Sequence, residues 1–229
     1  MGKRINGISS MATRALLAEA VDAWQRHGGA DAGFESVGGA DAARRVCDGE
    51  PFDVVVLAAE AIDQLHATGR IVEGGVTALA RSNVAMAVRH GAARPTVDSE
   101  EALRGAVLSA RSVGYSTGPS GVALQKLFAR WGITDAIRGR LVQAPSGVPV
   151  GALLARGDVE LGFQQLSELM HFEGIDVLGP MPPGLEIVTT FAGAVCTAST
   201  QPEAARALLD FIRSPAADQA RQRHGMQPA

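Results

Sequence analysis

The sequence is poor in the features that most readily reveal a protein class. Only 4% of its 229 residues are aromatic, two are cysteines, and no run approaches the roughly 18 apolar residues of a membrane span. Lys and Arg number 21 against 24 Asp and Glu, so the formal net charge is only −3. This near balance predicts neither nucleic-acid binding nor membrane insertion. The hydrophobic fraction of 46% is too high for a disordered chain.

Sequence motifs for the common cofactors are also missing. There is no P-loop, no GxGxxG, no HExxH and no GxSxG, and the five histidines are scattered. We therefore expect no cofactor and no metal. Cys47 and Cys196 lack metal-ligand spacing and are expected to be small buried residues, although the sequence leaves their pairing open.

The compartment is open as well. The first residues are basic but lead into no long apolar stretch, so we expect no signal peptide in this chain. The protein is then either cytoplasmic or a periplasmic protein whose signal peptide has been trimmed.

Short β-type runs alternate with helical patterns, which is typical of an α/β fold with mostly parallel sheets. The predicted strands are Arg4–Ile8, Gly33–Ser36, Asp53–Leu57, Val84–Arg89, Ser112–Tyr115, Arg140–Gln143, Val159–Phe163, Ile175–Leu178, Leu185–Val188 and Gly193–Thr197. The predicted helices are Ser10–His27, Asp41–Asp48, Ala59–Thr68, Ser99–Ala110, Gly121–Trp131, Pro149–Arg156, Pro202–Ser214 and Pro215–His224.

The order of these elements predicts two lobes. An extended segment at 82–89 and a loop at 91–98 precede a second series of strand–helix units, and the last two helices can return to the first lobe. We expect residues 1–81 with 191–229 to form lobe 1 and residues 82–190 to form lobe 2, with a ligand cleft between them.

Small polar residues occupy three strand-to-helix turns. A helix N-terminus that follows a strand presents free N–H groups to an anion. The alternative is that these residues merely cap their helices, as Ser10 and Asp41 could. The candidate ligand-binding residues are Ser9, Ser10 and Arg14 in the first turn, Gly38 and Gly39 in the second, and Ser116, Thr117, Ser120 and Gly121 in the third.

Two adjacent glutamines, Gln164 and Gln165, directly follow an apolar strand. Burying them is costly unless their amides find partners, so both are candidate ligand-binding residues. Glu168 lies shortly after them and is either a catalytic base or a solvated carboxylate at a helix start. No catalytic residue is assigned from the sequence.

The chain resembles the molybdate-binding protein family, class II periplasmic solute-binding proteins, over nearly its whole length. The matching stretches are Ser9–Arg14, Gly49–Val54 with Ala58, Pro119–Gly121, Gly151–Leu153, Leu161–Gly162 with Ser167, Ser214–Ala217 and His224–Met226. The resemblance implies a type 2 periplasmic-binding-protein fold. In that fold two α/β lobes joined by a hinge close on a small anion, which is held mainly by hydroxyls and backbone amides.

Within this resemblance the family's first ligand serine corresponds to Ser10 and a backbone amide donor to Ser120. Three other ligand positions differ, because Gly39 replaces a serine, Pro149 has no N–H, and Gln165 replaces a tyrosine. Together with Arg14 and Gln164, these changes favour a di- or tricarboxylate over molybdate.

The sequence therefore supports two functions. The first is a monomeric solute-binding protein for a small anion, with an ABC transporter as partner if the protein is exported. The second is an isomerase that shifts a proton on an unsaturated polycarboxylate such as aconitate, because a branch of the same superfamily catalyses that reaction.

Overall fold

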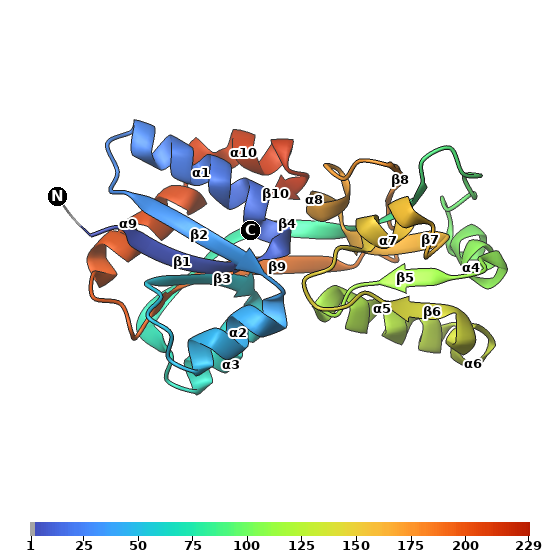
Figure 1. Ribbon diagram of the computed structural model, residues 1–229, viewed down its shortest axis with the longest axis horizontal. Helices are drawn as coiled ribbons and strands as arrows, with labels where there is room; N and C mark the ends of the chain where they lie inside the picture. Colours follow the sequence, from blue (N-terminus) through green and yellow to red (C-terminus); the bar gives the residue numbers. More distant parts are fainter. Residues whose placement is uncertain (1–2) are drawn as a thin grey trace. The chain divides into compact units, whose positions relative to one another are not determined.

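The computed structural model describes residues 3–229 and divides the chain into two compact units (Figure 1). Unit 1 holds the chain up to Ser82 together with Thr190–Ala229, and unit 2 holds Asn83–Thr189. The predicted lobe boundaries differ from these limits by one residue. Two long strands, β4 (Ile71–Arg89) and β9 (Val188–Cys196), pass from one unit into the other.

Unit 1 is built on a sheet in which parallel pairing dominates. β1 lies between β2 and β3 and is parallel to both, whereas β3 pairs antiparallel with β9 and the last strand pairs antiparallel with β4. The strands that lie wholly in unit 1 are β1 (Ile5–Ser10), β2 (Ala32–Val37), β3 (Val54–Ala58) and β10 (Met226–Gln227).

Helices cover both faces of this sheet (Figure 1). Side chains alternate between the faces of a strand, so α1 and α9 pack against Val54 and Val56, while α2 and α3 pack against Val55 and Leu57. The helices of unit 1 are η1 (Met11–Thr13), α1 (Arg14–Arg26), α2 (Gly39–Cys47), α3 (Ala59–Ala67), α9 (Pro202–Arg213), η3 (Pro215–Ala217) and α10 (Asp218–Arg223).

A buried carboxylate, Asp53, joins three segments of unit 1. It accepts hydrogen bonds from the Asn6 backbone N–H (3.0 Å), the Ser199 hydroxyl (2.6 Å) and the Gln201 side-chain amide (3.0 Å). Burial by itself raises the pKa of Asp53, but these donors outweigh it and the pKa lies below its ordinary value. Asp53 is therefore a charged anchor between β1, β3 and the segment that follows β9.

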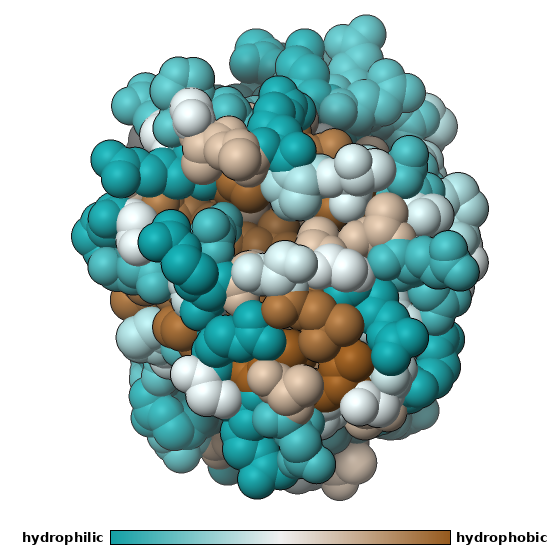
Figure 2. Space-filling model, turned by 90° about the vertical axis from the view of Figure 1, so that its right-hand side faces the viewer, coloured by the Kyte–Doolittle hydropathy of each residue, from teal (hydrophilic) through white to brown (hydrophobic). Residues whose placement is uncertain are grey.

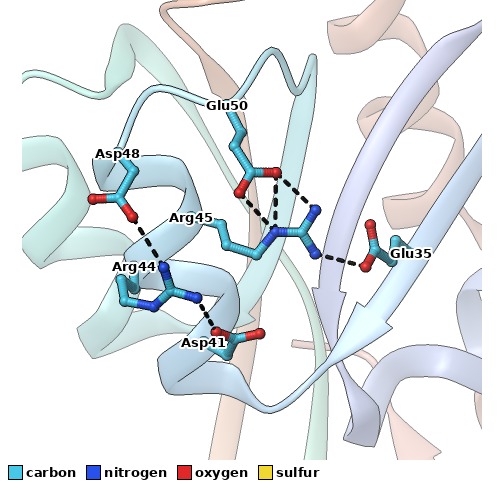
Figure 3. Close-up of polar contacts among 6 residues, drawn as sticks. All are labelled: Glu35, Asp41, Arg44, Arg45, Asp48 and Glu50. Atoms are coloured by element: carbon cyan, nitrogen blue, oxygen red, sulfur yellow. Dashed lines mark hydrogen bonds and ion pairs between the residues drawn. The ribbon is translucent and has the colours of Figure 1, made fainter.

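Arg45 makes a second polar anchor, at the end of α2 (Figure 3). Its guanidinium forks onto Glu50, with its Nη2 2.7 Å from Glu50 Oε2, and its Nη1 lies 2.6 Å from Glu35 Oε1. The same group lies over the ring of Phe52, 5.1 Å from the ring centre. Arg45 thus ties α2 to β2 and to the loop that leads into β3.

Arg221 is the largest fully buried side chain of the described residues. Its guanidinium donates to backbone carbonyls at the end of α9 and just beyond it, among them Ser214 (2.7 Å), and to the Asp218 carboxylate (2.6 Å). Carbonyls at a helix end lack intrahelical donors, so the arginine supplies them and fixes the turn between α9 and α10.

The two cysteines are free and lie in unit 1. Cys196 ends β9, is buried as predicted, and donates its backbone N–H to the Asp53 carbonyl (3.0 Å). Burial, with the negative charge of Asp53, raises the pKa of its thiol to about 12. Cys47 is only half-buried, because it ends α2 beside the loop, so the prediction of burial is wrong for this residue.

Unit 2, like unit 1, is a sheet with helices packed on both faces. β5 is parallel to β6 and β7, and β4 pairs antiparallel with β7 and β8. The strands are β5 (Val113–Tyr115), β6 (Leu141–Gln143), β7 (Leu161–Gln165) and β8 (Ile175–Pro180). The helices are α4 (Glu100–Ser109), α5 (Pro119–Arg130), α6 (Thr134–Ile137), η2 (Arg138–Arg140), α7 (Val150–Arg156) and α8 (Leu166–Leu169).

Two clusters form the core of unit 2. Phe128 and Phe163 belong to the cluster under α4, α5 and α6, while Val150 and Leu154 belong to the cluster under α7 and α8. Figure 2 looks at the side that carries α4 and α6 in Figure 1, and shows apolar side chains in its middle with hydrophilic ones around them. Leu108 of α4 is one of the few large apolar side chains that are exposed.

The α/β class predicted from the sequence is confirmed, but one predicted strand is wrong and two other predicted segments differ in extent or helix type. Leu185–Val188 is not a separate strand, because β9 begins only at Val188. Val84–Arg89 is only the end of β4, which starts at Ile71. The single helix predicted for Pro215–His224 is a 3₁₀ turn followed by a short α-helix.

Candidate ligand-binding site

The carboxyl ends of β1 and β2 place three serines at one edge of the sheet in unit 1. Ser9 lies opposite Ser36 in the parallel register, and their hydroxyls are 2.9 Å apart. Ser9 is fully buried, and its hydroxyl is engaged in the hydrogen bond with Ser36. Ser36 is therefore the partner of a predicted site residue and was not itself predicted.

Ser10 is the last residue of β1 and is only 8% exposed. Its backbone carbonyl accepts from the Thr13 hydroxyl (3.1 Å), but its own side chain caps no N–H of the following turn. Within residues 3–229 its Oγ has no hydrogen-bond partner. The capping alternative is therefore wrong for Ser10, whose buried hydroxyl is free for a ligand.

Gly39 of the second turn lies next to Ser10. Gly38 is the N-cap of α2 and Gly39 is its first residue, so Asp41 is not the cap and instead pairs with Arg44 (Figure 3). A Cβ at Gly39 would lie 3.8 Å from the Ser10 Cβ, an ordinary contact. Packing does not require glycine here, and its absent side chain leaves space beside the Ser10 side chain.

Arg14 begins α1 and is exposed. It lines a surface groove of about 460 Å³ between α1 and β2, together with Arg4, Asp22 and Phe34. The assignment of Arg14 to the ligand site stays a prediction.

In unit 2, the carboxyl ends of β5 and β7 lie side by side, with Tyr115 opposite Phe163. Ser116 follows β5, and its hydroxyl is 3.1 Å from that of Ser120 in the first turn of α5. N–H groups in a first turn have no intrahelical partner. Thr117, between them, is exposed.

Gly121 is needed for close packing. A Cβ at this position would lie 1.9 Å from the Ser116 carbonyl oxygen, which is impossible without moving the backbone. Its N–H is already donated to the Gly118 carbonyl (3.0 Å). Gly121 therefore shapes the turn that carries Ser116 and Ser120.

Gln164 is held at both ends of its buried amide. Its Oε1 accepts from the Val150 backbone N–H at the start of α7 (2.8 Å), and its Nε2 donates to Glu168 Oε1 (2.7 Å). Because a backbone N–H can only donate, the orientation of the Gln164 amide is fixed.

Glu168 lies on α8, the short helix that follows β7, and is half-buried. Withdrawal from water raises the pKa of its carboxyl group to about 7, and the hydrogen bond from Gln164 only partly opposes this. Near neutral pH the group is therefore divided between its charged and neutral forms. The sequence had left open whether Glu168 is a base or a solvated carboxylate, and a fully solvated group would not show this shift.

Gln165 is 4% exposed, and its Nε2 donates to the hydroxyl of Thr189 (2.7 Å), which is 6% exposed. Its Oε1 has no partner within residues 3–229. Thr189 was not predicted, because nothing near it in the sequence indicates that β9 brings it to the end of β7.

Each unit, taken by itself, thus carries a cluster of neutral polar groups at the carboxyl ends of its own parallel strands. In such sheets ligands bind outside this edge. Three buried side-chain atoms of the described chain lack a partner, and two of them, Ser10 Oγ and Gln165 Oε1, belong to predicted site residues. Hydroxyls and amides of this kind hold small polar ligands without neutralising their charge.

Comparison with known proteins identifies the class. The family described as bacterial extracellular solute-binding protein matches residues 5–227, so the chain belongs to this family. This confirms the predicted family resemblance and the solute-binding class.

Two characterised relatives differ in what their names say they do. An aconitate isomerase from a Pseudomonas species is 40% identical over 185 residues, which are 80% of this chain and 70% of the relative. The molybdate-binding protein ModA of Azotobacter vinelandii is 27% identical over 192 residues, 79% of this chain and 73% of that protein.

Solved structures share the fold at lower identity. The periplasmic molybdate-binding protein of Azotobacter vinelandii matches with a TM-score of 0.80 at 17% identity, over 97% of this chain and 98% of that one. The sulfate-binding protein SubI of Mycobacterium tuberculosis matches with 0.78 at 18% identity, over 100% and 88%. In the described part of the chain, no helix is both long and apolar enough to span a membrane.

Proposed function

We propose that the protein binds an unsaturated tricarboxylate and shifts a proton between two of its carbons, interconverting cis- and trans-aconitate. The observation that carries this proposal is the half-buried Glu168 carboxyl group, whose pKa is raised to about 7 beside Gln164 and Gln165. The 40% identical aconitate isomerase supports the same reaction.

The reaction needs a base and no other reactant. Aconitate has a CH₂ group next to one carboxylate and to the C=C bond, so a base can remove one of its protons. The double bond then moves to that carbon, and the proton returns to the other end of the allylic system. The product has the same atoms as the substrate and differs in the geometry of its double bond. A base with a pKa near the working pH performs both transfers well.

The proton shift passes through an intermediate with negative charge spread onto a carboxylate. Neutral donors placed around that charge stabilise it. Hydroxyls of Ser116 and Ser120 and the amide of Gln165, all in unit 2, are the groups we assign to this role. Together with Glu168 they form the proposed site.

A receptor that only bound an anion would gain nothing from a carboxyl group near the ligand. An ionised Glu168 would repel a tricarboxylate, whereas in an isomerase it is the group that does the chemistry. This is why Glu168 favours the enzyme over the receptor.

The first experiment is proton NMR of cis-aconitate with catalytic amounts of the protein. We expect signals of trans-aconitate to appear. Glu168→Gln should reduce turnover by about 10²- to 10⁴-fold, yet still bind tricarballylate, a saturated tricarboxylate that cannot react. The matched control is Glu173→Gln, an exposed carboxylate close by in the sequence, which should leave turnover unchanged.

The second candidate is a receptor for a small anion, with an ABC transporter as partner. Membership of a solute-binding family and the likeness to ModA favour it. Broadened tricarballylate or cis-aconitate lines without any trans-aconitate would support this receptor. If neither ligand is affected, the isomerase and a receptor for tricarboxylates are both wrong.

A further inference from the structure

The two adjacent glutamines differ in how their amides are held. The Gln164 amide is locked, because its oxygen faces a backbone N–H that can only donate. The Gln165 amide faces the Thr189 hydroxyl, with Nε2 2.7 Å from Thr189 Oγ1. A hydroxyl can donate or accept, so this contact does not by itself fix which end of the amide faces Thr189.

A half-turn of the Gln165 amide about its last side-chain bond therefore keeps the hydrogen bond. In the turned form the Thr189 hydroxyl donates to Oε1, and Nε2 takes the position of the atom that has no partner. The free end of the amide changes from an acceptor to a donor. The two forms have the same number of internal hydrogen bonds.

The ligand class decides between the two forms. A tricarboxylate at neutral pH offers only acceptor oxygens. It can therefore accept a hydrogen bond from the free Nε2 of the turned amide, but it cannot bond to the free Oε1 of the unturned amide. A hydrogen bond between Nε2 and a carboxylate is also stronger than one between neutral groups.

We propose that Thr189 is a positioning residue, whose hydroxyl holds the Gln165 amide with Nε2 turned toward a carboxylate of the ligand. This inference rests on the proposed function and extends it to a residue that does not itself touch the ligand. It makes Thr189 a determinant of the preference for carboxylates.

The test compares Thr189→Val, which keeps the branched shape but loses the hydroxyl, with Thr189→Ser, which keeps the hydroxyl. Calorimetry measures the binding of tricarballylate, and NMR measures the turnover of cis-aconitate. Loss of one supporting hydrogen bond should weaken tricarballylate binding about tenfold in Thr189→Val. The KM for cis-aconitate should rise with it, whereas kcat should change little. Thr189→Ser should remain within about threefold of the wild-type affinity.

A spectroscopic signature separates positioning from a general packing role. The side-chain ¹⁵N–¹H signals of Gln165, assigned by their disappearance in Gln165→Met, should shift when tricarballylate binds to the wild type. In Thr189→Val that shift should be reduced, while the thermal midpoint of the ligand-free protein stays close to the wild-type value.

The outcomes distinguish this inference from the function on which it rests. If the wild type binds tricarballylate and Thr189→Val binds it equally well, the role of Thr189 is wrong and the proposed function stands. If Thr189→Ser is as weak as Thr189→Val, the hydroxyl is not the cause and the inference is also overturned. If the wild type neither binds tricarballylate nor turns over cis-aconitate, the proposed function fails and this inference fails with it.

Discussion

Asp53 in unit 1 and Glu168 in unit 2 are both carboxyl groups withdrawn from water, but their pKa values move in opposite directions. Asp53 receives three hydrogen bonds and stays charged, whereas Glu168 receives one, from Gln164, and is half protonated near neutral pH. The number of donors, and not burial alone, decides the charge. Asp53 is suited to holding structure, and Glu168 is suited to moving a proton.

The largest effect is expected from Asp53→Asn. An asparagine cannot offer the negative charge that these three donors now share, so each hydrogen bond becomes a neutral one and we expect a loss of about 4 kcal/mol in the free energy of unfolding. Denaturant titration measures it, with the exposed Asp63→Asn as control. Because the pKa of Asp53 is lowered, its contribution exists above pH 3.8 and is lost as the pH falls through the lowered value. A variant as stable as the wild type at pH 7 would show that the three donors do not depend on the charge.

Glu168→Gln should give the opposite pH dependence. The pKa of Glu168 is raised in the folded protein. Its contribution to the free energy of unfolding is therefore fully present below pH 4.5 and is lost as the pH rises through about 7. The variant should match the wild type near pH 4.5 and exceed its free energy of unfolding at pH 8 by up to about 3 kcal/mol. Denaturant titrations at the two pH values check this. An equal difference at both would mean that Glu168 is not desolvated.

Gln164→Met should sharpen the comparison by removing the one donor to Glu168. The pKa of Glu168 should then rise further, so the acid limb of the isomerisation rate should move to higher pH. A pH–rate profile measures the shift, and Gln143→Met, at an exposed glutamine of β6, is the control. An unmoved profile would separate the acid limb from Glu168.

The smallest effect is expected from Glu50→Gln. Its pKa is lowered chiefly by the hydrogen bonds from Arg45, but its side chain is 39% exposed, so water and salt screen the pair. Thermal melts should show a shift well below that of Asp53→Asn, and high salt should remove it. A shift as large as that of Asp53→Asn would mean that exposure does not weaken this network.

The sequence was sufficient for the α/β class and for the turns that carry Ser10 and Ser120, because strand and helix signals are local. It was not sufficient for β4 and β9, since each of these strands passes from one unit into the other and its burial pattern changes along its length. The partners Ser36 and Thr189 depend on register and on contacts between distant strands.

Glu168 shows the same limit in its chemistry. From the sequence a solvated carboxylate at a helix start was the simpler interpretation. The shift of its pKa arises from packing around α8 and from the single donor on Gln164, and no local pattern encodes either.

Cys196 is a natural reporter of local opening in unit 1. Thiols react with alkylating agents as thiolates, and a buried group with a pKa of about 12 is almost never in that form while β3 and β9 stay paired. In a Cys47→Ser background, the rate at which Cys196 is labelled would therefore count how often this part of the sheet opens. The labelling rate would also register how much a bound ligand slows that opening, without any added probe.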